Sequence, residues 1–406
     1  MKPSIASPKD LLEVKKLWSY CFADSQEFTD YYFEKRYIQE NNVVVMDEEG
    51  QIKASLQLNP YNLIVEDVIK NVNYVVGVCV QPESRGLGYS SMLMRDTLNL
   101  QYNNNEDISI LMPIDTHLYT KYGYTNCFYR YEFKVDLINI KTEKTQYHVK
   151  RLNLEKIFEK EEHNFPHELA EAIEELSDFY HTQIRPGFAY IRRDKKYFVD
   201  KLQELSIDGG DLFLAYEGEV IKGYMMLLPK YQQDHGMVLE MMFENKTAHT
   251  TLMGIIKSHI TQFKTVDIIT PQHELFNTFI NYDNKYNVTK KSFMMARVID
   301  AKNILIETVK RSSLYQKDMA FSVKITDEMI DENDIVIEFN KGINKSEDIP
   351  FMTLHISDLA GLYMRSTTIE YLEKSEKIEF ENEERRKFFR ELFGSEVREN
   401  YINDFI

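Results

Sequence analysis

The segment at residues 82–90, Pro-Glu-Ser-Arg-Gly-Leu-Gly-Tyr-Ser, contains the residue types best suited to chemistry in this chain. It follows a β-branched run at 74–80 (YVVGVCV) and precedes a stretch of helical periodicity from about Ser90 to Leu100. Two glycines allow close approach of the backbone to a ligand, and the start of the helix presents unpaired N–H groups. This pattern favours a pyrophosphate site. The alternative for a bare Arg-Gly-x-Gly string is an ordinary turn between a strand and a helix.

The sequence V-x-V-x-P-x-x-R-G-x-G at residues 78–88 resembles the acetyl-CoA signature of the GNAT superfamily of N-acetyltransferases. In that family an Arg-x-x-Gly-x-Gly/Ala segment binds the pyrophosphate, which here corresponds to Arg85, Gly88 and Ser90, with serine as a small departure. The resemblance implies that the preceding strand exposes its backbone to the acetyl carbonyl and pantetheine arm, where a bulge parts it from the next strand. The cofactor-binding residues implied are Val78, Cys79, Val80, Arg85, Gly86, Leu87, Gly88, Tyr89, Ser90, Ser91, Ile114 and Asp115.

Tyr119 is the residue that we expect to transfer a proton. It begins the sequence Y-x-x-x-G-Y at 119–124, which resembles the family's Tyr-x-x-x-Gly-Phe segment, whose first tyrosine faces the departing sulfur. A phenol with a pKa of about 10 can donate to a thiolate whose conjugate acid has a pKa of about 8.5. Ile114 and Asp115 end the neighbouring strand and are expected beside the cofactor arm. The alternative for Asp115 is a helix N-cap in Asp-Thr-His.

The elements around these residues follow a strand, loop and helix order within the first 145 residues. The sequence predicts a first helix that begins near Ser7 and Pro8, a hairpin of 43–46 and 52–58 around a turn at 47–50, and strands at 74–80 and 108–112. A weaker copy of this order follows, with a hairpin at 212–216 and 220–227 and a strand at 238–243. That strand leads into Glu-Asn-Lys-Thr-Ala at 244–248, without an arginine-glycine loop. We therefore expect a duplicated domain that has lost cofactor binding.

The pattern changes after about residue 293. Short strands and helices are predicted at 320–325, 335–339, 352–356, 357–363 and 383–393. This order is typical of a third, α+β domain.

Two acetyltransferase-like halves followed by a small α+β domain resemble the enhanced-intracellular-survival (Eis) type of bacterial acetyltransferase. The resemblance implies an α/β and α+β fold. Its parts would be a catalytic GNAT domain that binds acetyl-CoA at 1–145, a degenerate GNAT-like domain at 146–292 and a sterol-carrier-protein-like domain at 293–406. It also implies homohexamers that acetylate amines, including aminoglycosides at more than one position.

In the Eis-type family the terminal carboxylate enters the active site as general base, which corresponds here to the carboxylate of Ile406. An α-carboxylate with a pKa of about 3.5 is ionised at neutral pH and can take a proton from an ammonium group. The ending YINDFI is too apolar for a freely solvated terminus, although the family usually ends in phenylalanine. Asp24 matches an acidic substrate contact of the family, and Asp404 lies two residues from the terminus. The alternative for each acid is a solvated surface position.

Composition excludes several function classes. With 49 basic against 65 acidic residues, a net charge of −16 and no basic block, general binding to nucleic acid is not expected, and a cationic partner fits better; the alternative is an acidic surface that maintains solubility. Cys21, Cys79 and Cys127 are odd in number and lack metal-ligand spacing, so we expect no disulfide framework, no metal and a reducing cytoplasm. No signal peptide or membrane span is expected.

The sequence therefore predicts an acetyl-CoA-dependent N-acetyltransferase that acts by direct transfer on a small-molecule or lysine amine, such as an aminoglycoside or polyamine. In the implied mechanism Ile406 frees the amine of a proton, backbone donors stabilise the oxyanion, and Tyr119 protonates coenzyme A. Two alternatives stay open. One is a noncatalytic acyl-CoA or lipid-binding protein, against which the Arg85 loop and Tyr119 argue. The other is a protein-lysine acetyltransferase with the same chemistry.

Overall fold

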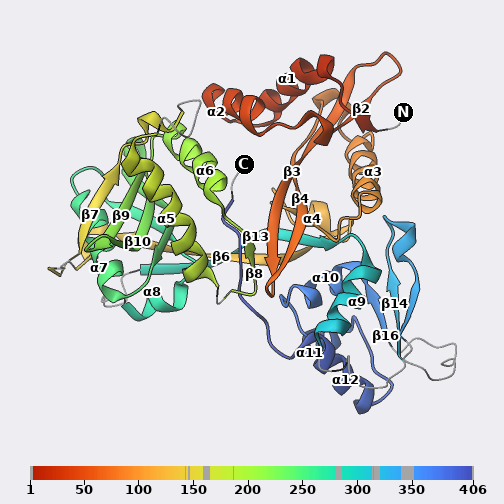
Figure 1. Ribbon diagram of the computed structural model, residues 1–406. Coiled ribbons are helices and arrows are strands. Elements are labelled where there is room, and N and C mark those ends of the chain that lie inside the picture. The colour runs from red at the N-terminus through yellow and green to blue at the C-terminus, as the bar shows by residue number, and fades with distance from the viewer. Residues whose placement is uncertain are drawn as a thin grey trace.

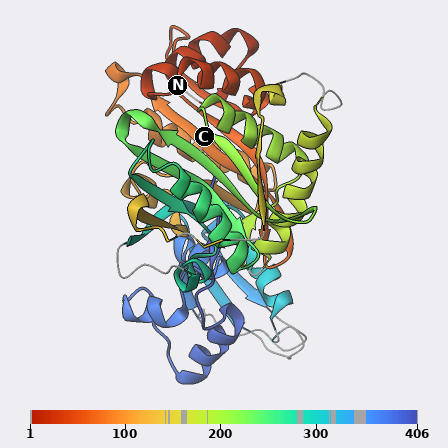
Figure 2. The ribbon, with the colours of Figure 1, turned by 90° about the vertical axis from the view of Figure 1, so that its left-hand side faces the viewer.

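The protein has three lobes, two of which share a long mixed sheet (Figure 1). The structure is a computed structural model. It describes residues 3–141, 143–144, 147–158, 165–185, 187–279, 286–312, 314, 321–339 and 352–404. Figure 2 shows the C-terminal lobe, in blue, at one end of the molecule.

The first half of the chain carries the predicted strand, loop and helix order. Its elements are β1 (Ser4–Ile5), α1 (Leu11–Cys21), α2 (Gln26–Tyr31), β2 (Asn42–Met46), β3 (Ile52–Val65), β4 (Val68–Val80), α3 (Tyr89–Asn103), β5 (Ile108–Leu111), α4 (His117–Thr120) and β6 (Thr125–Asp136). The first helical segment begins at Ser7, which forms a capping box with Asp10, so the predicted start is present. The hairpin of β2 and β3 extends antiparallel into β4, which pairs parallel with β5.

The second half repeats much of this order. Its elements are β7 (His148–Leu152), α5 (His167–Ile184), β8 (Ala189–Ile191), α6 (Lys195–Ile207), β9 (Asp211–Glu217), β10 (Val220–Lys230), β11 (His235–Phe243), α7 (Lys246–Ser258), β12 (Thr265–Ile269), α8 (His273–Phe279) and β13 (Tyr286–Val298). Alternate residues of β9 pack on opposite faces of the sheet. Leu212 and Leu214 pack with α5 and α6, and Phe213 and Ala215 pack with α7.

Strands β6 and β13 each belong to both halves of the 14-stranded sheet. Residues 295–298 of β13 lie between β5 and the start of β6, whereas residues 132–136 of β6 lie between β12 and the start of β13. Each half therefore receives one strand segment from the other. The domain boundary expected between residues 292 and 293 falls inside β13.

Among the described residues, the C-terminal lobe contains a three-stranded sheet and four α-helices. Its elements are α9 (Ala301–Arg311), β14 (Phe321–Thr326), β15 (Val336–Phe339), β16 (Met352–His355), α10 (Ile356–Tyr363), α11 (Ile369–Lys374) and α12 (Glu383–Phe393). The chain then returns as β17 (Asn400–Tyr401), which pairs with β8 between the two halves. Leu305 and Ile356 of this lobe share one apolar core with Val44 and Leu93 of the first half. Burial of apolar side chains therefore holds the lobe against the first half rather than leaving it on a linker.

Candidate functional site

The loop between β4 and α3 turns on two glycines with left-handed backbones. Gly86 has φ +80° and Gly88, the residue before the first helical turn, has φ +85°. A Cβ atom at either position would meet no other atom within 4 Å, so both glycines border open space. Backbone conformation therefore requires glycine here, and the open space leaves room for a ligand close to the main chain.

The N-terminus of α3 is not capped by a side chain. Its first backbone hydrogen bond runs from the Met92 amide to the Gly88 carbonyl at 3.0 Å. The amides of Gly88, Ser90 and Ser91 have no hydrogen-bond acceptor in the part of the chain that the structure describes. Free amides at the positive end of a 15-residue helix form a site for an anionic group such as a phosphate.

Strands β4 and β5 part at the end of β4 that carries this loop. Their pairing ends at Val75 and Leu111, so residues 76–80 of β4 face a gap on that side. On the other side the pairing with β3 contains a bulge opposite Leu56. Gly77, in the bulge, has φ +63°, and any side chain there would collide with the Trp18 ring. The edge of β4 that includes Val78, Cys79 and Val80 is thus available to a ligand.

Arg85 lies exposed at the mouth of this gap. Its Nε donates to the Val80 carbonyl at 3.4 Å, and its Nη2 lies 3.9 Å from the Cys21 sulfur. The pKa of Cys21 is lowered to about 6, first because the Cys79 thiol donates to it, against the opposing effect of burial, and then because of Arg85. The buried Cys79 has a pKa that is raised instead. Arg85 is therefore an exposed cation beside an ionisable thiol, in a position to pair with an anionic ligand.

Tyr119 lies in α4, at the start of the turn formed by residues 119–124. Its ring contacts the Tyr124 ring edge-on at 6.4 Å between centroids. Tyr122, in the same turn, shares a 2.9 Å hydrogen bond with Ser91 of α3, so the tyrosine turn is attached to the loop helix. The pKa of Tyr119 is raised, mainly because the partly buried side chain is less well solvated. The phenol is therefore protonated at neutral pH and can serve as a proton donor.

Ile114 and Asp115 occupy the exposed link between β5 and α4. Ile114 is 82% exposed. The Asp115 carboxylate accepts the His117 amide at 2.9 Å and contacts the His117 ring at 3.1 Å. The backbone hydrogen bond from His117 is the first cause of the lowered pKa of Asp115. The Asp115 carboxylate therefore bonds within the turn that leads into α4, whose N-cap position is occupied by Thr116.

A cavity of about 430 Å³ lies where the two halves meet, next to the gap between β4 and β5. Met112, the residue after β5, is part of its wall. Its acidic side chains are Asp24 of the first half and Glu204 and Asp208 near the end of α6, against one lysine, Lys201. The rest of the wall is largely apolar and is formed by Phe28, Met112, Leu205, Met226, Met237 and Leu239. Three acids against one base give a formal charge of −2, which favours a cation with apolar parts.

Asp404 ends the described chain close to this cavity, although it is not part of the cavity wall. It is buried, and its Oδ1 accepts a hydrogen bond from Tyr197. Its Oδ2 is buried without a hydrogen-bond partner among the described residues. Asn403 next to it donates to the Leu239 carbonyl at 2.6 Å, which fixes the chain end at the cavity wall. Ile406, expected to supply the terminal carboxylate, lies outside the described residues.

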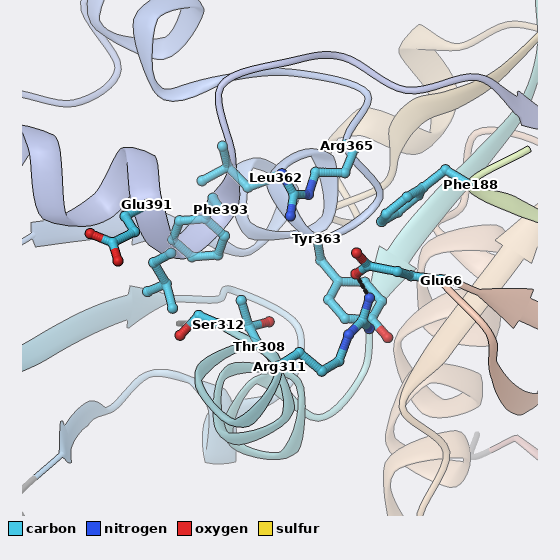
Figure 3. A pocket seen from close by; sticks show the side chains of 11 residues that line it. Glu66, Phe188, Thr308, Arg311, Ser312, Leu362, Tyr363, Arg365, Glu391 and Phe393 are labelled. Atoms are coloured by element: carbon cyan, nitrogen blue, oxygen red, sulfur yellow. Dashed lines mark ion pairs between the residues drawn. The ribbon is translucent and has the colours of Figure 1, made fainter. Parts of the chain in front are cut away.

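A smaller cavity of about 190 Å³ lies elsewhere, between the C-terminal lobe and the first half (Figure 3). Arg311 on its wall pairs with Glu66 and, at 3.0 Å, with Glu307. None of the residues predicted for the site lines it. It is a polar seam between lobes, separate from the loop and the acidic cavity.

The sequence did not point to the acids of α6 or to the partners of Tyr119. Glu204 and Asp208 are four residues apart on or just after a helix, a spacing that puts both carboxylates on one face. That spacing was a readable signal, but nothing local indicated that this face meets Asp24. Within the described residues there is no group of three or more side chains placed to hold a metal ion, and no helix that is long and apolar enough to cross a bilayer.

Residues 3–127 match the model of the acetyltransferase (GNAT) domain. The whole chain is similar in fold to a GCN5-related N-acetyltransferase from Anabaena variabilis (TM-score 0.78, 17% identity, 100% of both chains). It is also similar to a conserved protein of unknown function, described as a probable N-acyltransferase, from Enterococcus faecalis (TM-score 0.78, 17% identity, 99% of both chains). Eis1 from Mycobacterium abscessus shares the fold as well (TM-score 0.71, 11% identity, 100% of both chains). No curated protein sequence matches the chain. The chain thus carries an acetyltransferase domain, and its overall fold is that of the N-acetyltransferases.

Proposed function

We propose that this protein is an acetyl-CoA-dependent N-acetyltransferase of the Eis type that acts on cationic amines such as aminoglycosides or polyamines. The observation that carries the proposal is the juxtaposition of two sites on either side of the gap between β4 and β5. On one side are the free amides of Gly88, Ser90 and Ser91, with Arg85 beside them. On the other is the acidic cavity at Met112. An anionic donor and a cationic acceptor would therefore meet at the parted strands.

The loop residues fit the requirements of coenzyme A. Its pyrophosphate needs donors and positive charge, which the α3 amides and Arg85 provide. Its pantetheine arm has amide groups that can pair with the free edge of β4 at Val78, Cys79 and Val80. Bound there, acetyl-CoA supplies the activated acetyl thioester. In this proposal the candidates for the cofactor site are residues 78–80 and 85–91, with Ile114 and Asp115 at its outer edge.

Tyr119 is the proposed acid. Its raised pKa keeps the proton on the phenol at neutral pH, and its connection to α3 through Tyr122 and Ser91 keeps it beside the cofactor loop. The carboxylate of Ile406 is the proposed base. Its position in the sequence, two residues after the buried Asp404, supports this role, because two residues of extended chain span at most about 7 Å.

The acceptor chemistry follows from the cavity wall. Burial raises the pKa of Glu204, and Lys201 lowers it again in part. A cationic amine that enters the cavity would compensate the buried charge of Glu204 and lie against Phe28 and Met112. Asp24, held by the Trp18 indole at 3.0 Å, would contact a second amino group. Aminoglycosides and polyamines have several amino groups, which suits a wall with several acids.

The proposal includes the domain plan and assembly of the Eis type. Residues 1–145 would form the catalytic domain, 146–292 a degenerate copy, and 293–406 a domain similar to sterol carrier proteins, in a cytoplasmic hexamer. The similar strand orders on the two sides of the β6 and β13 exchange support the duplication. The direct test of assembly is the molar mass in solution by light scattering.

The function is tested by measuring release of coenzyme A from acetyl-CoA with a panel of amines: an aminoglycoside, spermidine, a lysine peptide and a neutral alcohol. We expect turnover with the first two, and a sharp loss of it in a chain extended by a few residues beyond Ile406. Full activity of the extended chain would remove the terminal base from the mechanism. Turnover with the lysine peptide alone would favour a protein-lysine acetyltransferase. Binding of acetyl-CoA without turnover of any amine would favour the noncatalytic alternative.

A further inference from the structure

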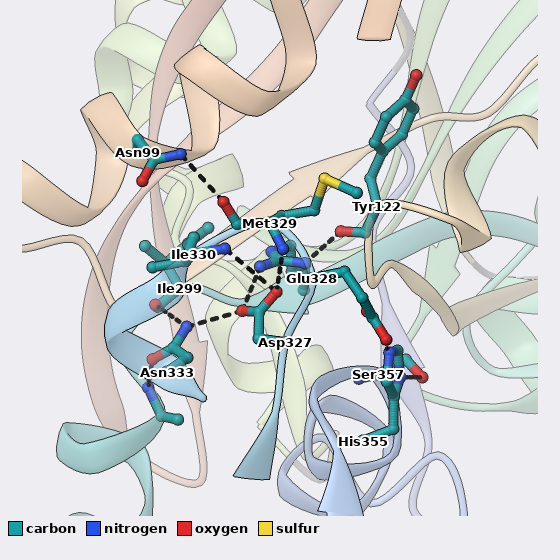
Figure 4. Close-up of polar contacts among 12 residues, drawn as sticks. Asn99, Tyr122, Ile299, Asp327, Glu328, Met329, Ile330, Asn333, His355 and Ser357 are labelled. Atoms are coloured by element: carbon teal, nitrogen blue, oxygen red, sulfur yellow. Dashed lines mark hydrogen bonds and ion pairs between the residues drawn. The ribbon is translucent and has the colours of Figure 1, made fainter. Parts of the chain in front are cut away.

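Arg297 and Asp327 form an ion pair inside the molecule, between β13 and the C-terminal lobe (Figure 4). Arg297 lies near the end of β13, and Asp327 directly follows β14. The Arg297 Nη2 is 2.6 Å from the Asp327 Oδ2, and both side chains are fully buried. Each of these buried charges needs the other as a partner, because a single unpaired charge in the protein interior would lose its hydration and gain no ion pair in return.

The second amino group of Arg297 reaches the turn that carries Tyr119. Arg297 Nη1 donates to the Tyr122 carbonyl. The next residue, Gly123, has φ +80°, and a side chain there would collide with the Arg297 guanidinium. Glycine is therefore required at position 123 for two reasons, the left-handed backbone and the close approach of the Arg297 side chain.

The turn that contains Tyr122 holds the backbone of Tyr119. The amides of Tyr122 and Tyr124 both donate to the Tyr119 carbonyl, at 3.0 and 3.4 Å. The Tyr122 carbonyl lies in the next peptide unit, whose Gly123 amide donates to the Thr120 carbonyl at 2.9 Å, so a shift of that carbonyl disturbs the same turn. Arg297 thus binds the turn that holds the Tyr119 backbone, without a hydrogen bond to the phenol.

Asp327 is held in turn by groups of the C-terminal lobe. Its Oδ1 accepts the amides of Met329 and Ile330 at 2.9 and 3.3 Å, and its Oδ2 accepts the Asn333 side-chain amide at 3.0 Å. Asn333 also donates to the Ile299 carbonyl at 2.8 Å, just after β13. The carboxylate is therefore fixed before it meets Arg297, which makes the pair a rigid connection rather than a flexible surface contact.

We propose that Arg297 and Asp327 are positioning residues, through which the C-terminal lobe holds the Tyr119 turn in place for proton transfer. This inference rests on the proposed role of Tyr119 as acid. It gives the C-terminal lobe a role in catalysis without requiring that it bind a lipid. The role is that of a clamp: Asp327 orients Arg297, Arg297 orients the Tyr122 peptide, and that peptide orients Tyr119.

The clamp is tested on the full chain with 3-fluorotyrosine at position 119, whose phenol titration is followed by ¹⁹F NMR. Arg297→Met should release the turn to solvent, so that the pKa of the labelled phenol falls by roughly 1 unit from its value in the labelled parent. Arg297→Lys keeps the charge but cannot span both partners, and Asp327→Asn keeps the size of the carboxylate. Both milder variants should shift the pKa in the same direction by less.

Arg193→Met is the matched control. Arg193 pairs with Glu240 at 2.6 Å, is as deeply buried as Arg297, and lies in the second half without a hydrogen bond to residues 119–124. It should lower the melting temperature comparably and leave the Tyr119 titration unchanged. If Arg297→Met lowers the melting temperature and the titration does not move either, the pair is only structural and the proposal is overturned.

Turnover gives a second, separate readout. In Arg297→Lys and Asp327→Asn, kcat should fall by about 10- to 100-fold while KM for acetyl-CoA stays unchanged, because the hydrogen bonds of this ion pair go to the Tyr122 carbonyl and the C-terminal lobe rather than to the loop at 82–88. A rise in KM with unchanged kcat would contradict the clamp. If no variant and no parent shows turnover, the proposed function fails, and the ¹⁹F titration still decides whether the clamp exists.

Discussion

Strands β4 and β11 occupy corresponding positions in the two halves of the long sheet, but the helices that follow them begin in different ways. In the first half β4 leads through a glycine loop into α3, whose preceding residue, Gly88, has no side chain to cap the helix. In the second half β11 leads into α7 almost directly, and the Asn245 side chain accepts the Ala248 amide at 3.0 Å. No side chain caps the first amides of α3, whereas the Asn245 side chain accepts a hydrogen bond from one of the first amides of α7. This difference is the reason for placing the proposed phosphate site in the first half.

The second half has a different use for its surface. Its α6 contributes Glu204 and Asp208 to the acidic cavity, and its β11 contributes Met237 and Leu239. The exchange of β6 and β13 fixes this wall relative to the first half. In the proposed function the first half would bind the donor, and the second half would form much of the acceptor wall.

The largest expected effect is at Tyr119, the proposed proton donor, which lies in the first half. Tyr119→Phe removes the phenolic proton and keeps the ring, so kcat should fall by about 10²–10⁴-fold. Coenzyme A release in steady state measures it. Tyr231→Phe is the same chemical change at an exposed tyrosine of the second half and should leave kcat unaltered. Equal activity of Tyr119→Phe and the parent would mean that water, rather than Tyr119, protonates the coenzyme A thiolate. The two halves would then differ only in ligand binding.

A smaller effect is expected at the cofactor loop. Arg85→Ala removes a charge-assisted contact of about 1.5–3 kcal/mol, so the dissociation constant of coenzyme A should rise by about 10- to 100-fold. Isothermal titration calorimetry measures it. Lys246→Ala, at the first position of α7, is the matched change in the second half and should leave the affinity as it is. Equal losses in both variants would mean that the two helix ends are not functionally different.

The local part of this comparison could be predicted from the sequence. The β4 run, the loop at 82–88 and the start of α3 depend on neighbouring residues, and the structure has a strand, loop and helix where they were predicted. The absence of the loop after β11 was visible for the same reason. β-branched runs and glycines act within a few residues, so they are readable without knowledge of the fold.

The long-range part could not be predicted. β13 pairs with β5 and β6, at least 150 residues earlier in the chain, and nothing in its own sequence names these partners. The meeting of Asp24 with Glu204 depends on that pairing. The Arg297 clamp needs three segments at once. Such contacts are determined by tertiary packing. The hydrophobic periods of about 2 residues in strands and 3.6 residues in helices do not specify which elements pack together.

A reactive thiolate is expected in the first half, where all three cysteines lie. Cys21 has a pKa of about 6, so it loses its proton as pH rises through about 6 and is largely a thiolate at neutral pH. Its alkylation rate should rise from pH 5 and level off by about pH 7, followed by mass spectrometry. Cys127, whose pKa is raised to about 12 by burial, is the internal control and should stay unmodified.

Two results would change this interpretation. If the alkylation rate of Cys21 still rises through about pH 8.5, the ordinary pKa of a free thiol, no neighbouring donor stabilises the Cys21 thiolate. If Arg85→Ala leaves the pH profile of this rate unchanged, Arg85 does not stabilise the thiolate. The expected result is an upward shift of the profile by less than about one unit, because Cys79 still donates.

The smallest expected effect tests whether an uncapped helix alone makes a site. Asn245→Ala exposes the α7 amides and should lower the free energy of unfolding by about 1 kcal/mol, measured by urea denaturation. It should not create affinity for coenzyme A, and the double variant Arg85→Ala/Asn245→Ala should bind no better than Arg85→Ala. The reason is that α7 still lacks the open glycine turn and the cation of the first half. A gain in affinity in the double variant would mean that the cap alone closed the second site, and that the glycine loop is dispensable.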